Sequence, residues 1–338
     1  MTRHRSLNLM LYLLVPVMVM TISVALGRYP IGLKDIFILL ALKIRGESIE
    51  SLRTINTVVF NVRLPRILGA MVVGSSLSLS GTVYQSTFRN PMVSPGILGV
   101  ANGAGFGAAL GILLSFGFAG VQFAAFLFGL AAVGITCFIS GLSEKSGGSL
   151  LTLVLVGMVI STIFSSLISL IKYTADPDDK LPAITFWLMG SLSTVTLKEV
   201  LFTFIPVTAG SIPLILLRWK LNILTFGEEE AAAMGVNTRI MRMIIIFCST
   251  VITAAAISVS GIVGWVGLII PHICRMILGP DHKSLVPLSM AAGAVYLMIV
   301  DDVARSVSRF EIPLGIITSL IGAPFFLYLI FRKKGAWQ

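Results

Sequence analysis

Charged residues are scarce in this sequence, and that scarcity limits the kind of protein it can encode. Only 12% of its 338 residues are Asp, Glu, Lys or Arg, whereas 56% are hydrophobic. A soluble globular domain carries roughly a quarter charged residues. Apolar runs of about 20 residues, the length that crosses a bilayer as a helix, follow one another along the chain. The composition therefore argues against a soluble fold and predicts an all-α protein that crosses a membrane many times.

The motifs of several enzyme classes are also absent. The sequence contains no GxxxxGK[ST], so the chain has no P-loop that would hold a nucleotide. It contains no HExxH and no GxSx serine paired with a membrane histidine, which argues against an intramembrane hydrolase. We therefore predict that the chain is not an enzyme and holds no cofactor. Any ATP and Mg²⁺ that drive its function would be bound by another polypeptide.

Cysteine is rare, and ionisable side chains are missing from the middle of the predicted helices. Cys137, Cys248 and Cys274 each lie alone in an apolar run, so neither a metal site nor a disulfide framework is predicted. Every Asp, Glu, Lys and Arg falls at or near a predicted helix end. A secondary transporter driven by protons or sodium usually needs ionisable groups at midplane depth. Their absence argues against that class.

The net charge of +10 does not indicate nucleic-acid binding, because the basic residues form short clusters between apolar runs and no continuous face. With both termini in the cytoplasm, the predicted inner loops hold 13 Lys and Arg residues and the outer loops hold 12. The positive-inside rule therefore favours this orientation only slightly. Seven of the outer twelve lie in residues 28–66, which suggests a docking face for an acidic partner.

Ten apolar runs are predicted to be membrane-spanning helices: residues 7–26, 63–84, 94–114, 119–140, 149–171, 200–217, 240–259, 265–278, 285–300 and 313–331. The first run ends near Ser23-Val24-Ala25, which resembles a signal-peptide cleavage site. A run of about 20 residues is long for a signal peptide, so we interpret it as an uncleaved first helix. Short interfacial helices are expected at 35–42 and 183–192.

A weak internal repeat is visible. Arg63 and Arg66 precede a helix that ends in Ser80-Gly81, and Arg239 and Arg242 precede one that ends in Ser260-Gly261. Five spans in each half would make the halves inverted, a common plan among transporters. The predicted fold is therefore a single membrane domain of two inverted five-helix halves, residues 1–198 and 199–338.

Two stripes of small residues recur at four-residue spacing. Gly103, Gly107 and Gly111 leave a groove where another helix backbone can approach. Farther along the chain, Gly157 is followed by Ser161, Ser165 and Ser169 on one helix face. Serine and glycine are common in the contacts between membrane helices, but hydroxyl groups also line solute pathways. The sequence leaves both interpretations of this second stripe open.

Five segments together resemble a known transporter family: RLPR from Arg63, RNPMVSPGILGVANGAG from Arg89, GEEEAAAMGVN from Gly227, GWVGLIIPHICRMILGPDHK from Gly264 and EIPLGIITSLIGAPFF from Glu311. This set is similar to the permease subunits of ABC importers for iron-siderophore complexes, haem and cobalamin. The resemblance implies a prokaryotic plasma-membrane protein that works with a second permease copy or close homologue. It also implies two ATPase subunits and an extracytoplasmic substrate-binding protein as partners.

The resemblance also implies roles for particular residues. The substrate-binding protein would dock on three arginines, Arg63, Arg66 and Arg305. For Arg63 and Arg66, snorkelling of the side chain to the membrane interface is the simpler interpretation. The translocation pathway would include Gly157, Met158, Ser161 and Ser165. The cytoplasmic gate would be formed by Asn90, Met92, Ser146, Gly147 and Gly148. ATPase coupling would lie in loop 221–238, with Glu228, Glu229, Glu230, Ala231, Met234 and Gly235, a stretch that by itself predicts only a capped surface helix.

Two function classes remain, the permease of an ATP-driven importer and a passive channel or structural membrane protein. A polar inner loop suited to a soluble partner and a basic outer face favour the importer. An iron-siderophore complex is the expected substrate, with haem, cobalamin or an oxyanion as alternatives. His272 and Arg275 share a helix face near Asp281 and His282. Capping and loop packing explain that cluster more simply than a metal site or proton relay.

Overall fold

The computed structural model describes residues 2–46, 50–142 and 150–332, and it contains helices and turns but no strand in these ranges. Ten apolar helices correspond to the ten predicted spans within this part of the chain. They are α1 (Thr2–Ala25), α4 (Leu64–Thr87), α5 (Val100–Leu113), α6 (Phe118–Leu142), α7 (Leu150–Thr174), α9 (Leu197–Leu216), α12 (Thr238–Ser260), α13 (Val266–Leu278), α14 (His282–Ser306) and α15 (Leu314–Arg332). Six of them are long and apolar enough to cross a membrane, and the other four have shorter apolar segments, Leu14–Ala25, Val100–Leu113, Val266–Leu278 and Leu314–Leu329. The protein is a multi-pass membrane protein.

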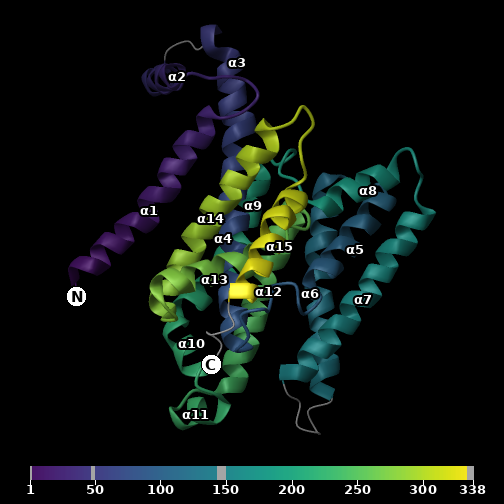
Figure 1. Ribbon diagram of the computed structural model, residues 1–338. Coiled ribbons are helices and arrows are strands. Elements are labelled where there is room, and N and C mark those ends of the chain that lie inside the picture. Colours follow the sequence, from purple (N-terminus) through teal and green to yellow (C-terminus); the bar gives the residue numbers. More distant parts are fainter. Residues whose placement is uncertain (1, 47–49, 143–149, 333–338) are drawn as a thin grey trace.

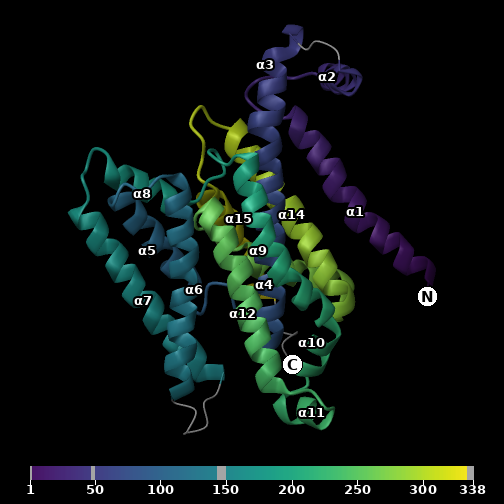
Figure 2. The same ribbon diagram turned by 180° about the vertical axis from the view of Figure 1, so that it is seen from behind.

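Helix α4 lies at the centre of the molecule. It packs against α9, α12, α13 and α14, and α12 continues the contact to α5 and α6. Helices α5, α6 and α7 form a group at one side, and α1 lies at the opposite side (Figures 1 and 2). The largest group of buried apolar side chains joins α4 to α13 and α14, with Leu77, Val266 and Leu297 among its members.

Small residues let neighbouring backbones touch. A Cβ atom built on Gly81 of α4 would lie 1.9 Å from the carbonyl oxygen of Gly267 in α13. The predicted groove on α5 is confirmed, and its partner is α6: a Cβ on Gly107 would lie 2.3 Å from the Ala124 oxygen. Lipid tails are as apolar as leucine, so close van der Waals packing of this kind is a main source of helix association in membranes.

Four predicted helix boundaries were wrong by five residues or more. Helices α1 and α5 begin at Thr2 and Val100 instead of residues 7 and 94. The other two errors lie at charged residues. The helix predicted to begin at Arg63 begins at Arg53 and is continuous through α3 (Arg53–Asn56), the π-helical segment η2 (Thr57–Arg63) and α4. A short 3₁₀ turn, η1 (Glu50–Leu52), precedes it. The helix predicted to end at Val300 continues to Ser306. In both cases, buried opposite charges allow the helix to carry ionisable residues inside it, as described below.

The short helices mark the two ends of the molecule (Figure 1). Helices are present at the two positions predicted to hold interfacial helices, as α2 (Leu33–Arg45) and α8 (Lys180–Met189). The end that carries α2 and α3 is called the α2 end. At the opposite, α11 end lie α10 (Arg218–Leu224) and α11 (Glu228–Ala233). Helix α1 begins, and α15 finishes, in the half of the molecule that carries α11. The inverted repeat stays a prediction.

Candidate functional site

The three arginines predicted to dock a binding protein meet at the α2 end, but their side chains are buried. Arg63, Arg66 and Arg305 are only 3%, 4% and 6% exposed. Each guanidinium is bonded within the chain, so none is presented at the surface in this arrangement. A docking partner would have to displace these internal bonds. The docking role of the three arginines therefore stays a prediction.

Arg66 is held by two carboxylates. Its Nε lies 2.7 Å from Oδ1 of Asp301, and its Nη1 lies 2.7 Å from Oε1 of Glu311. Arg305 pairs with Asp302 and lies 3.6 Å from Asp301, which is 1% exposed and inside α14. The expectation that ionisable groups stay at helix ends was therefore wrong here. A charge inside a helix is tolerated because its partner and hydrogen bonds are buried with it.

The side chains of Arg63 and Arg305 also cap the C-terminal end of α1. Arg63 Nη1 donates to the carbonyl oxygens of Val24 at 2.6 Å and Ala25 at 3.0 Å. Arg305 donates to the carbonyl oxygens of Ser23 at 2.7 Å and Leu26 at 3.0 Å. The last carbonyl groups of a helix have no partner within it and carry a partial negative charge. Two guanidinium groups therefore satisfy and neutralise the end of α1.

Exposed basic side chains surround this buried cluster at the α2 end. Arg28, Lys34, Arg53 and Arg309 are all exposed. The predicted docking face for an acidic partner therefore has candidate residues even with the three arginines buried. Such rim charges mainly accelerate and orient an encounter.

The predicted pathway stripe on α7 divides into two parts. A Cβ on Gly157 would lie 2.6 Å from the carbonyl oxygen of Ile97, so this position serves helix packing. The backbone oxygen of Ser161 accepts a hydrogen bond from Asn102 Nδ2 at 3.1 Å. Met158 and Ser165 are exposed, on a helix at the edge of the molecule (Figures 1 and 2). Only the exposed part can face a solute, lipid or a second subunit.

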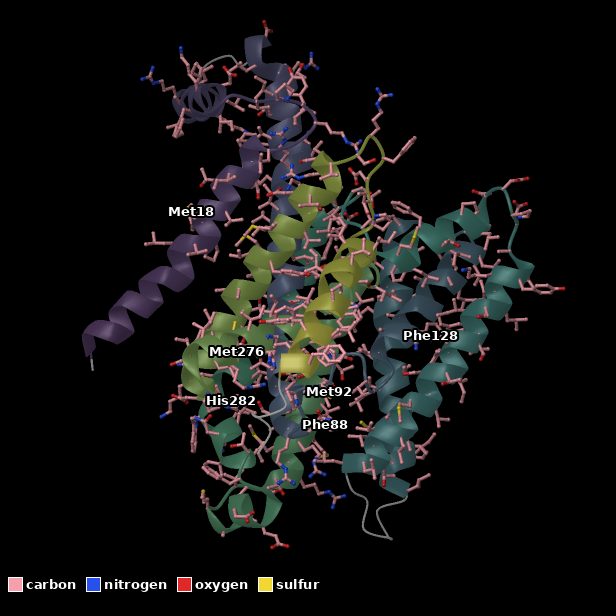
Figure 3. The ribbon with its side chains drawn as sticks, viewed as in Figure 1. Met18, Phe88, Met92, Phe128, Met276 and His282 are labelled. Atoms are coloured by element: carbon pink, nitrogen blue, oxygen red, sulfur yellow. The ribbon has the colours of Figure 1, made fainter. Side chains whose placement is uncertain are left out.

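Only one of the two segments predicted to form the gate lies within the described residues. Asn90 and Met92 lie in the turn after α4, where Asn90 Oδ1 accepts a hydrogen bond from the Met92 backbone N–H at 2.9 Å. Both side chains are exposed, and Figure 3 places Met92 between α12 and the α6–α7 group. Ser146, Gly147 and Gly148 lie outside the described residues. The role of the turn as a gate stays a prediction.

The predicted coupling segment forms a small exposed helix anchored from one side. In α11, Ala231 is fully buried, whereas Glu229 and Glu230 are exposed, as is Met234 directly after the helix. Gly235 follows the helix with φ +79°, the left-handed conformation typical of a helix end. Asn237 Oδ1 then caps α12 by accepting from the Ile240 N–H at 3.0 Å. The surface helix expected from the sequence is confirmed; its partner is not tested by this geometry.

The residues near His272 form a hydrogen-bonded cluster at the α11 end. Both ring nitrogens of His282 are engaged, one with Ser86 and the other with Asn222 Oδ1 at 2.7 Å. Asp281 caps α14 by accepting from the Lys283 N–H at 3.1 Å. Among the described residues, no group of three His, Cys, Asp or Glu side chains is arranged to hold a metal ion. The expected capping role is confirmed for Asp281.

Sequence reasoning missed the residues of α4 and α10 that complete this cluster. Ser86, Gln85 and Asn222 are ordinary polar residues in the sequence, separated from His282 by 196, 197 and 60 positions. No local pattern marks them. The packing of α4 against α13 and α14, and of α10 against α4 and α14, brings them together.

Comparisons with known proteins agree with this architecture. The FecCD transport family matches residues 13–332. The molybdate import system permease protein MolB of Haemophilus influenzae is 43% identical over 93% of this chain and 92% of that protein. A permease protein assigned to an iron chelatin transport system in Helicobacter pylori is 40% identical over 85% of this chain and 86% of that protein.

A solved structure shares the fold over almost the whole chain. It is assigned to a metal-chelate type ABC transporter in an inward-facing conformation. The TM-score is 0.85 at 42% sequence identity, with 95% of this chain and 97% of that chain covered. The family match and these relatives extend over far more than half of the sequence. This chain therefore belongs to the FecCD transport family and is a permease of the ABC importer class.

Proposed function

We propose that two copies of this chain, or one copy and a close homologue, enclose a solute path across the plasma membrane of a prokaryote. The observation that carries this proposal is the exposed face of α7, where Ser165 and Met158 have no cover within the chain. A second subunit facing this side would complete a channel whose α7 wall carries hydroxyl groups, such as that of Ser165, beside apolar side chains, such as that of Met158. In this proposal, one chain alone provides only one wall of the channel.

The two ends of the molecule take different partners in this proposal. A substrate-binding protein docks at the α2 end, which is extracytoplasmic and carries the exposed basic residues. Two ATPase subunits bind at the α11 end, where Glu229 and Met234 protrude from the short helix. Both termini are then cytoplasmic. ATP and Mg²⁺ belong to the ATPase, and this chain requires no cofactor of its own.

Chelated iron is the first candidate substrate. Support comes from the chelate assignments of the Helicobacter pylori relative and of the solved structure. Molybdate is the second candidate, favoured by the 43% identity to MolB. Haem and cobalamin are further alternatives within the importer class. In this proposal any of these substrates can be carried, because the selectivity of the import step would reside in the binding protein.

Transport by reconstituted vesicles tests the proposal. The permease would be inserted into liposomes with its ATPase, and its binding protein would be added outside with either ⁵⁵Fe-chelate or ⁹⁹Mo-molybdate. We expect ATP-dependent accumulation of one of them and none with an ATPase variant that lacks its P-loop lysine. Accumulation by the permease alone, driven by a proton or sodium gradient, would contradict the proposal.

The exposed face of α7 can be tested separately by thiol labelling. In a background with Cys137, Cys248 and Cys274 replaced, we expect Ser165→Cys in the assembled complex to react with a water-soluble maleimide. The matched control is Phe202→Cys on α9, which is 62% exposed in the chain and would face lipid. Equal labelling of both positions would argue against a water-accessible path along α7.

A further inference from the structure

A cavity of about 290 Å³ lies at the α11 end, where the last turn of α4 meets α13 and α14. Its walls include Gln85, Arg89 and Asn90 from α4 and the turn after it, His272 and Arg275 from α13, and His282 from α14. Figure 3 shows His282 in this half of the molecule, with Phe88 and Met92 on the neighbouring turn. The cavity is separate from the exposed face of α7.

Two guanidinium groups line this cavity without a carboxylate partner. No Asp or Glu oxygen lies within 4.0 Å of Arg89 or Arg275 in the part of the chain that the structure describes. Arg275 Nη2 donates to Gln85 Oε1 at 3.1 Å, and the Gln85 amide in turn donates to the Gly267 and Leu268 oxygens at 3.3 Å. The amide holds Arg275 in place but leaves its charge uncompensated.

Three sources of negative charge lie around the cavity, and two of them are already engaged in hydrogen bonds. The last carbonyl oxygens of α4, those of Tyr84, Gln85 and Ser86, accept backbone N–H groups from the following turn at 2.8 to 3.2 Å. The Asp281 carboxylate accepts from Asn222 Nδ2 at 2.7 Å and from the Lys283 N–H. The Glu230 carboxylate is the third source. A Cβ on Gly227 would lie 2.3 Å from Glu230 Oε2 and 3.6 Å from Arg89 Nη1, so these two atoms are at most the sum of both distances, 5.9 Å, apart, but they form no ion pair within 4.0 Å. Among the described residues, neither guanidinium is therefore paired directly with a carboxylate.

We propose that this cavity binds a tetrahedral oxyanion, a phosphate or a group of the same shape and charge, between Arg89 and Arg275. Planar guanidinium groups bind such oxygens through paired, charge-assisted hydrogen bonds. The volume suffices for the anion with several waters, since one water occupies about 30 Å³. The phosphate group comes either from a soluble anion or from a lipid headgroup; both supply the same chemistry.

The position of the cavity gives the bound anion a mechanical consequence. Arg89 precedes Asn90 in the predicted gate turn, and Thr225 on the cavity wall belongs to the predicted coupling loop. Arg89 Nη1 lies 3.6 Å from the place where a Cβ on Gly227 would stand. An anion held by Arg89 and Arg275 would therefore connect the turn after α4, the α13 helix and the base of α11.

Anion binding to the purified full-length permease in an uncharged detergent tests the proposal. Thermal unfolding would be followed against phosphate concentration, with chloride keeping the ionic strength constant. We expect saturable stabilisation by phosphate or by a short-chain phosphatidylglycerol. Two variants remove one cation each, Arg89→Asn and Arg275→Gln, and each should weaken binding by at least about tenfold. Asn suits position 89 because it tolerates the φ of +48° found there.

A control variant shows whether binding depends on this cavity, and comparison of the two ligands identifies the source of the phosphate group. Lys220→Gln removes a cation from α10 at the same end, outside the cavity, and should leave binding unchanged. Binding of free phosphate identifies a soluble anion as ligand, and binding of phosphatidylglycerol alone identifies a headgroup. No saturable binding of either, or the same affinity in Arg89→Asn, would overturn the proposal. Arg89 is exposed, so its variant decides even if Arg275→Gln fails to fold.

Discussion

The buried pair of Arg66 and Asp301 allows a quantitative prediction. Replacing Arg66 by Met leaves the Asp301 carboxylate, 1% exposed, with only Arg305 at 3.6 Å. Breaking a buried pair from one side costs about 3–5 kcal/mol. Asp301→Asn leaves Arg66 with Glu311 at 2.7 Å, so the smaller loss of one charged hydrogen bond, about 1.5–3 kcal/mol, is expected.

The double variant R66M/D301N should be more stable than the sum of the single effects predicts. It removes both buried charges, and Glu311 is 27% exposed at its side chain and can be hydrated. We expect a coupling free energy of about 3 kcal/mol. Reversible unfolding in mixed micelles, followed by circular dichroism, would measure all four proteins. Arg309→Met, at an exposed position of the same end, is the matched control and should have little effect.

Additive single effects, within about 0.5 kcal/mol, would refute this reasoning. The same geometry changes how docking must be tested. Changing Arg63, Arg66 and Arg305 together to Glu would gather carboxylates in a buried cluster that already holds Asp301 and Asp302. Loss of uptake would then report misfolding. Uptake by R66M/D301N is the cleaner test, because a folded protein with normal uptake would exclude docking through Arg66.

Three further predictions concern packing, coupling and capping. Gly81→Ala should cost about 1–3 kcal/mol in unfolding experiments because its Cβ meets the Gly267 oxygen, whereas Gly134→Ala, with open space around it, should not destabilise the protein. Glu229→Arg should weaken co-purification of the ATPase, with Glu229→Gln intermediate; full assembly of the Arg variant would count against coupling through α11. Asp281→Ala should cost about 1 kcal/mol at neutral pH. Burial alone would raise the pKa of Asp281, but hydrogen bonds from Asn222 and the Lys283 N–H lower it overall. The cap therefore stabilises above the unfolded pKa of about 3.9 and is lost as pH falls through the lower folded pKa, so the variant should equal the unaltered protein in strong acid.

Helix number was predictable from the sequence because hydropathy acts locally. Helix boundaries at charges were not. Arg66 and Asp301 appeared to lie at helix ends because an isolated charge inside a bilayer is costly. Each removes that cost for the other, but they are 235 residues apart in the sequence. Likewise, the glycines of α5 predicted a close neighbour without identifying α6.

The candidate site was predictable to a similar extent. The exposed helix at Glu229 follows from local capping signals, and the structure confirms its form. The stripe on α7 needed the structure to separate Gly157, which packs against another segment, from the exposed Ser165. The cavity between Arg89 and Arg275 joins residues 186 positions apart, which no periodicity in a single sequence reveals.

The hydrogen bonds from Arg305 to the C-terminal end of α1 have a consequence for biosynthesis. During synthesis, helix α1 receives one of its two terminal partners only after about 280 further residues have been made, since Ser23 and Arg305 are 282 positions apart. Until α14 inserts, the nascent chain holds α1 through Arg63 and few other contacts. Ribosome-bound chains that stop before Arg305 should therefore leave α1 open to quality-control proteases, and chains that extend past Arg305 should protect it.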